Sequence, residues 1–152
     1  MKIRPTPLSI LELLRRTTVF VAVIAFGATL SLDAWAGSYL DRAGLLVRQG
    51  RSEADYLEYR VGNRELAELV HKMATARLSA ARDMAVPKEV TQAHPHILLM
   101  LENCERAADA AEAGESDRFV IYQRRARDEE QIFRSIMRQL GFPLEDEKKK
   151  KD

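Results

Sequence analysis

Residues 95–116, PHILLMLENCERAADAAEAGES, decide the fold that the sequence predicts. Apolar residues recur in this stretch three or four positions apart, which is the spacing of one face of an α-helix. The stretch opens with a proline, which is favoured at the first position of a helix because its missing N–H needs no partner there. It closes on Gly114, a residue type that often ends helices in the left-handed conformation, and Ser116 can cap the next helix. A link this short makes the two flanking helices antiparallel neighbours.

The same apolar spacing extends outward on both sides of this stretch. After the link, a helix is predicted to run to about Leu140. Before it, the pattern predicts a long helix over residues 53–85, capped by Ser52, with a soft point at residues 62–63, and a short helix that stops near Gly50. The sequence therefore predicts an all-α fold, a small antiparallel bundle of three long helices and a short N-terminal helix.

Each predicted long helix carries one apolar stripe when its residues are placed at about 100° intervals. These stripes define the predicted core. It comprises Tyr59, Leu66, Val70, Met73, Ala74, Ala81 and Met84, then Ile97, Leu101, Cys104, Ala108 and Ala111, then Phe119, Tyr122, Ala126, Phe133, Ile136, Met137 and Leu140.

The first 36 residues have the features of a secretory signal. Arg15-Arg16 precedes sixteen uncharged residues, 17–32, and Ala34 and Ala36 occupy the −3 and −1 positions of a cleavage site. A basic region, an apolar stretch and small residues in this order are typical of a signal peptide. The alternative is an uncleaved signal anchor, but spanning a bilayer takes about 20 apolar residues. The sequence therefore predicts export to the periplasm or cell envelope, with the membrane contacted only through this segment if it is retained.

The remaining chain divides into a predicted domain, residues 37–143, and a charged tail, residues 144–152. After position 36 there are 20 basic and 21 acidic residues, so the domain is almost neutral. A nearly neutral domain lacks the basic surface of a nucleic-acid-binding protein. The sole cysteine, Cys104, excludes an intramolecular disulfide and a metal site made of several cysteines.

The three histidines are the candidate metal ligands. His94 and His96 are two residues apart, and two such imidazoles can hold a divalent ion. His71 follows Glu68 in the Glu-x-x-His spacing that ferritin-like di-iron bundles use twice, but this spacing occurs once here. A structural metal site needs about four ligands, most often several His or Cys side chains. We therefore predict no bound metal and no cofactor, and the three histidines are weak candidates.

One charge interrupts the apolar pattern of the second predicted helix. Arg77 projects close to the centre of its stripe, and Glu129 and Glu130 flank the stripe of the fourth helix. Charged side chains rarely enter a core unless they are paired. The sequence therefore predicts a structural ion pair between Arg77 and Glu129 or Glu130. In the alternative interpretation these three side chains line a polar groove that receives a ligand.

No catalytic site is predicted. Cys104 lies in an apolar stripe, where thiols are usually inert, and the sequence has no Ser-His-Asp grouping or phosphate-binding glycine loop. The predicted function is that of a non-enzymatic cell-envelope protein that binds an unknown protein partner, or a second copy of itself, through its helical surface. The alternative is a periplasmic metal or cofactor carrier that uses the His94 and His96 end.

Overall fold

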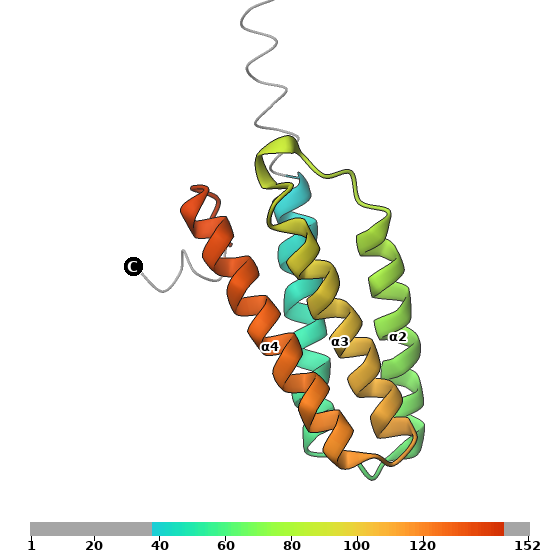
Figure 1. Ribbon diagram of the computed structural model, residues 1–152. Helices are drawn as coiled ribbons and strands as arrows, with labels where there is room; N and C mark the ends of the chain where they lie inside the picture. Colours follow the sequence, from blue (N-terminus) through green and yellow to red (C-terminus); the bar gives the residue numbers. More distant parts are fainter. Residues whose placement is uncertain (1–37, 145–152) are drawn as a thin grey trace, which may run out of the picture. The chain divides into compact units, whose positions relative to one another are not determined.

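The described part of the chain is entirely helical. The structure is a computed structural model that describes residues 38–144 (Figure 1). Four helices occur in this range: the N-terminal helix (residues 38–58), α2 (Arg64–Arg82), α3 (His94–Glu112) and α4 (Ser116–Gln139), with a short 3-10 turn, η1 (Lys88–Val90), before α3. No strand occurs among these residues, so the all-α prediction is confirmed.

The four helices form an up-down-up-down bundle. α3 packs against both α2 and α4, and the N-terminal helix runs beside them (Figure 1). The links at residues 59–63 and 113–115 lie at one end of the bundle, and η1 lies at the other. Consecutive helices are therefore antiparallel, an arrangement that the short link at Gly114 predicts for α3 and α4.

The second half of the chain follows its local sequence signals closely. Pro95 lies in the first turn of α3, and Gly114 has a φ of 78°, the left-handed conformation expected after a helix end. The predicted cap at Ser116 is wrong, because Ser116 is already the first residue of α4. Glu115 precedes it in the cap position, and its side chain makes no capping hydrogen bond.

The first half differs from the prediction at Gly50. We expected a helix to end there and a new one to be capped by Ser52, but both residues lie inside the N-terminal helix. The physical reason is packing. A Cβ atom at position 50 would lie 3.3 Å from Leu101 Cδ2 and 3.6 Å from Cys104 Sγ. The glycine therefore permits close contact between the N-terminal helix and α3, and it does not end a helix.

The break occurs instead at residues 59–63, where the sequence indicates only a soft point. The Asn63 side chain accepts a hydrogen bond from the Leu66 N–H at 3.0 Å, which caps the start of α2. The long helix predicted over residues 53–85 is thus two antiparallel helices, and the N-terminal helix is not short.

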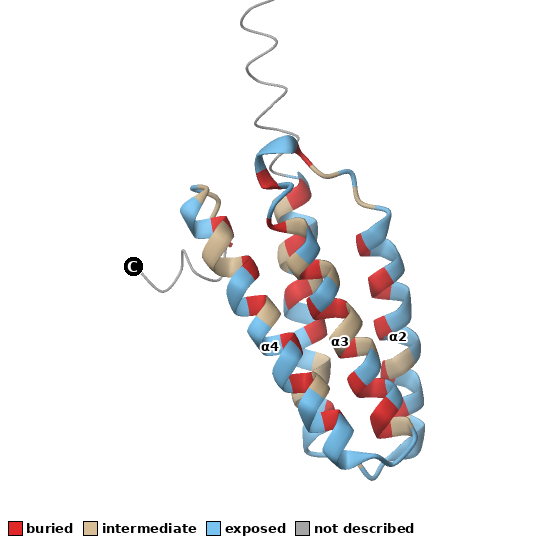
Figure 2. Ribbon diagram, viewed as in Figure 1, coloured by how far each residue is buried: buried red, intermediate tan, exposed pale blue. Residues whose placement is uncertain are grey.

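The core consists of two clusters of buried residues, one toward each end of the bundle (Figure 2). The first contains Tyr39, Ala43, Val47, Leu78, Ala81, Val90, Ala93, Ile97, Met100, Leu101, Cys104, Ala126, Phe133, Met137 and Leu144. The second contains Leu57, Ala67, Val70, Ala107, Ala108, Ala110, Ala111 and Phe119.

Two residues predicted in the core lie on the surface. Tyr59 is 84% exposed and Met73 is 42% exposed. Both were placed by treating residues 53–85 as one helix. The observed core face of α2 adds Ala67 and Leu78, which lie with the predicted Ala74 on the opposite side of Val70 from Met73.

The packed domain reaches one residue beyond its predicted end. Gly141 has a φ of 83°, and Leu144, which we assigned to the tail, is buried against the first cluster. Among the described residues no helix is both long enough and apolar enough to cross a membrane. The predicted signal segment, with Ala34 and Ala36, lies outside the described residues.

Candidate functional site

A polar layer separates the two apolar clusters and is the candidate functional site. We define it as Glu53, Arg77, Gln123 and Glu130, contributed by the N-terminal helix, α2 and α4. Arg77, Gln123 and Glu130 are buried, and the Glu53 side chain is 19% exposed. Charged groups in a bundle core mark either a ligand site or a structural network, so the partners of each decide between the two.

Arg77 is buried and paired, but its partner differs from the prediction. The guanidinium Nη2 donates to the Glu53 Oε1 carboxylate oxygen, and neither Glu129 nor Glu130 is the partner. The prediction placed Glu53 and Arg77 in one continuous helix, 24 residues and therefore about 36 Å apart. The break at residues 59–63 folds that segment into a hairpin and brings the two side chains together.

The α4 members of the layer bind the N-terminal helix. Glu130 Oε1 accepts from Arg134 Nε at 2.7 Å and lies 3.5 Å from Arg51 Nη1. Gln123 Nε2 donates to Glu58 Oε2 at 2.9 Å and to the Ala54 carbonyl at 3.3 Å. The layer therefore links the N-terminal helix to α2 on one side and to α4 on the other.

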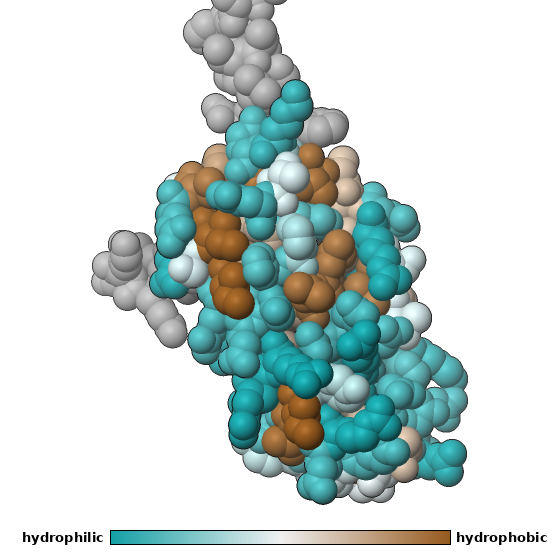
Figure 3. All heavy atoms as spheres, in the orientation of Figure 1, coloured by the Kyte–Doolittle hydropathy of each residue, from teal (hydrophilic) through white to brown (hydrophobic). Residues whose placement is uncertain are grey.

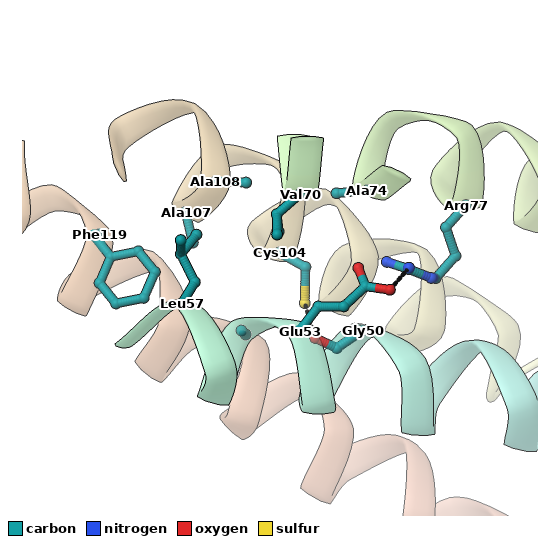
Figure 4. A pocket seen from close by; sticks show the side chains of 11 residues that line it. Gly50, Glu53, Leu57, Val70, Ala74, Arg77, Cys104, Ala107, Ala108 and Phe119 are labelled. Atoms are coloured by element: carbon teal, nitrogen blue, oxygen red, sulfur yellow. Dashed lines mark hydrogen bonds and ion pairs between the residues drawn. The ribbon is translucent and has the colours of Figure 1, made fainter. Parts of the chain in front are cut away.

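A small cavity lies beside the Arg77–Glu53 pair (Figure 4). Its volume is about 10 Å³, and it is lined by Gly50, Glu53, Ala54, Leu57, Val70, Ala74, Arg77, Cys104, Ala107, Ala108 and Phe119. A second space of about 10 Å³ lies on the α4 side of the layer, between Arg51, Cys104 and Glu130. Neither volume can hold an organic substrate.

Cys104 borders both spaces, but its chemistry is suppressed. Burial raises the pKa of the Cys104 thiol to about 12, although the positive charge of Arg77 acts in the opposite direction. The thiol therefore remains protonated at neutral pH, and a protonated thiol is a poor nucleophile. This agrees with the inert role expected from its place in an apolar stripe.

The three histidines each contact a different side chain. The pairs are His71 Nδ1 with Glu112 (2.8 Å), His94 Nδ1 with the Tyr39 hydroxyl (3.2 Å) and His96 Nδ1 with Glu129 (2.7 Å). His94 and His96 lie in the first turn of α3, whereas Glu112 ends it, so His71 lies about 24 Å away along α3. Within residues 38–144 no group of three or more His, Cys, Asp or Glu side chains is placed to share a metal ion.

The pair formed by the buried Tyr39 and the partly buried His94 is a feature that the sequence alone does not indicate. Burial raises the pKa of Tyr39 to about 12 and lowers the pKa of His94. Tyr39 lies at the start of the N-terminal helix, in the predicted short helix, and no local pattern indicates its partner 55 residues later.

The polar layer is therefore a network in which each carboxylate has a cationic partner, Glu53 within the layer and Glu130 through Arg51 and Arg134 beside it. The neighbouring Cys104 thiol is protonated and the adjoining spaces are of water size. No family model, curated protein or solved structure matches the chain, so the chain is assigned to no family.

Proposed function

We propose that this chain is an exported, non-enzymatic protein that binds a protein partner through the outer face of α2. The proposal rests on one observation, an exposed apolar stripe on a helix whose other face is already buried in the core. We define the stripe as Leu69, Met73, Ala76 and Ala80, all of which are exposed.

The stripe has the geometry of a helix-binding surface. At 100° per residue its four members fall within an arc of about 60° and extend about 16 Å along α2. The core-facing residues Ala74 and Ala81 of α2 lie about 130° and 110° from the centre of the stripe. An amphipathic surface helix normally has a single apolar stripe, so the second one needs a separate explanation.

The N-terminal helix extends the same face. Glu53 and Arg77 form the contact between the two helices. Around each helix axis, Tyr56 lies about 60° from Glu53, and Met73 lies about 40° from Arg77. Since both are about half exposed, each lies on the solvent-facing side of this contact. By contrast, apolar side chains on the face formed by α3 and α4 are divided into patches by hydrophilic residues (Figure 3).

The partner that fits this surface is an amphipathic helix. Helices are recognised by apolar anchors repeating at three- and four-residue intervals, which the stripe provides. Ala76 and Ala80 are small, so a second helix can approach closely there. Ala76 also borders an open surface hollow of about 310 Å³, lined by His71, Lys72, Thr75 and Ala76. The metal-carrier alternative has less support, because His94 and His96 contact separate side chains.

A photo-crosslinking amino acid at position 73 is expected to capture one partner in the producing cells. The matched control is position 121, because Ile121 is 50% exposed on α4, outside the stripe. The captured protein would be identified by mass spectrometry and purified. Met73→Glu should then weaken its binding about 30-fold or more, as loss of a central apolar anchor does, while Ile121→Glu should change it less than about threefold.

Circular dichroism must show equal helix content and melting temperature for both variants. A captured species with twice the mass of the chain would identify the partner as a second copy. Equal capture at the two positions, or unchanged binding by Met73→Glu, would contradict the proposal.

Export is tested separately by intact-mass measurement. Protein recovered from the envelope fraction is expected to begin at Gly37, because Ala34 and Ala36 suit signal peptidase. Substituting both alanines by leucine should block processing, so that the longer species accumulates in the membrane. A full-length mass for the unmodified protein, together with membrane retention, would show that the segment is an anchor.

A further inference from the structure

The Glu53 carboxylate is only half satisfied. Its Oε1 atom accepts from Arg77, whereas its Oε2 atom is buried and accepts no hydrogen bond from the described residues. In Figure 4 a dashed line joins one Glu53 carboxylate oxygen to Arg77, and none reaches the other oxygen. Buried carboxylate oxygens in folded proteins nearly always have a donor, and the surrounding Ala74, Ala107 and Ala108 side chains supply none.

The cavity has the size and the polar atoms that a single water needs. Its volume is about 10 Å³, and one water requires about 10–15 Å³ of such space with two or more polar partners. Glu53 Oε2 supplies one acceptor. Arg77 and Cys104 also line the cavity, where the guanidinium can donate to a water and the sulfur can accept weakly. The Cys104 thiol donates its hydrogen to the Gly50 carbonyl at 3.9 Å, so Arg77 is the donor that remains for a water.

We infer that the cavity beside Glu53 is a binding site for one water molecule, which donates to Glu53 Oε2 and is an integral part of the polar layer. Arg77 donates a hydrogen bond to one oxygen of the Glu53 carboxylate, and the water donates one to the other oxygen. The water also fills the gap among the N-terminal helix, α2 and α3, where Ala54, Ala74, Ala107 and Ala108 contribute only methyl groups. This inference is independent of the proposed partner-binding face, which lies on the outside of α2.

Oxygen-17 relaxation dispersion of solvent water tests the inference on the purified protein, because it counts waters that are held for longer than nanoseconds. The unmodified protein should hold one such water more than the Ala74→Val variant, in which two added methyl groups occupy the cavity. The matched control is Ala80→Val, the same change at an exposed position of the same helix, and it should leave the count unchanged.

A second variant keeps the test decisive if Ala74→Val fails to fold. Replacing Glu53 and Arg77 together by leucine removes the carboxylate that holds the water, and the count should again fall by one. Equal counts for the unmodified protein and either folded variant would overturn the inference. So would loss of a long-lived water in Ala80→Val.

Discussion

Replacing Arg77 by methionine is expected to lower the free energy of unfolding by about 3–5 kcal/mol. Methionine retains most of the aliphatic stem but removes the charge, so Glu53 remains behind in the core without its cation. The Arg77 side chain is 6% exposed and the Glu53 side chain 19%, and a carboxylate in such surroundings is costly when it has no partner. Urea-induced unfolding at pH 7, followed by circular dichroism, measures the change.

Two further variants identify the cause. Adding Glu53→Leu to Arg77→Met should recover part of the lost stability, because the two residues are in contact and their effects are not additive. The matched control is Lys72→Met, also on α2. Lys72 pairs with Glu68, and their side chains are 71% and 51% exposed, so its loss should cost less than about 1 kcal/mol. A cost below about 0.5 kcal/mol for Arg77→Met would show that Arg77 is not in the core.

The domain is expected to lose stability steeply between pH 9 and pH 12. Cys104 has a pKa of about 12 in the folded protein against an ordinary value of 9.0, and Tyr39 has about 12 against 10.0. Both folded-state values are raised, so the folded state binds these protons more tightly than the unfolded state does. The stabilisation is complete below the ordinary pKa of each group and is lost as the pH rises toward 12.

The expected size of this loss is about 4 kcal/mol for Cys104 and about 3 kcal/mol for Tyr39, at about 1.4 kcal/mol per pKa unit. Together these approach the whole stability of a typical domain, about 5–15 kcal/mol. Urea unfolding in a series of buffers from pH 8 to pH 12 measures the slope. Tyr39→Phe and Cys104→Ala should each reduce the fall in the free energy of unfolding with rising pH, even if the variants are less stable at pH 8. A double variant that loses stability as steeply as the unmodified protein would contradict the assignment.

The two halves of the chain show where sequence reasoning succeeds. Gly114 and Gly50 are both glycines in helical surroundings, and both were predicted to end a helix. Gly114 does so, because its backbone adopts a positive φ. Gly50 remains helical because Leu101 and Cys104, more than 50 residues later, occupy the space of a side chain. A local sequence pattern can indicate a helix end such as the one at Gly114. It cannot indicate the close contact at Gly50, because that contact depends on how α3 packs.

The error at Gly50 also explains what was missed in the polar layer. The spacing of apolar residues along α2 is enough to predict that Arg77 is buried, because the burial of a helix position follows from its neighbours on the same helix. Its partner depends on where the preceding helix ends. The chain reverses direction at residues 59–63, and this brings the Glu53 carboxylate to Arg77. Glu130 is instead bound by Arg51 and Arg134. The exposure of Met73 has the same cause. Because the chain reverses at residues 59–63, the buried face of α2 is not a continuation of the buried face of residues 53–58.

The order in which the helices follow one another has a kinetic consequence. Because each helix lies beside the next one along the chain, most contacts can form between segments that are close in sequence. The N-terminal helix joins distant segments when it packs onto α3 and α4, through contacts such as Tyr39 with His94, 55 residues apart, and Arg127 with Asp55, about 70 residues apart. Chains with such local contacts fold in microseconds to milliseconds. We therefore expect this domain to reach its native state within milliseconds, which leaves little time for its apolar surfaces to aggregate.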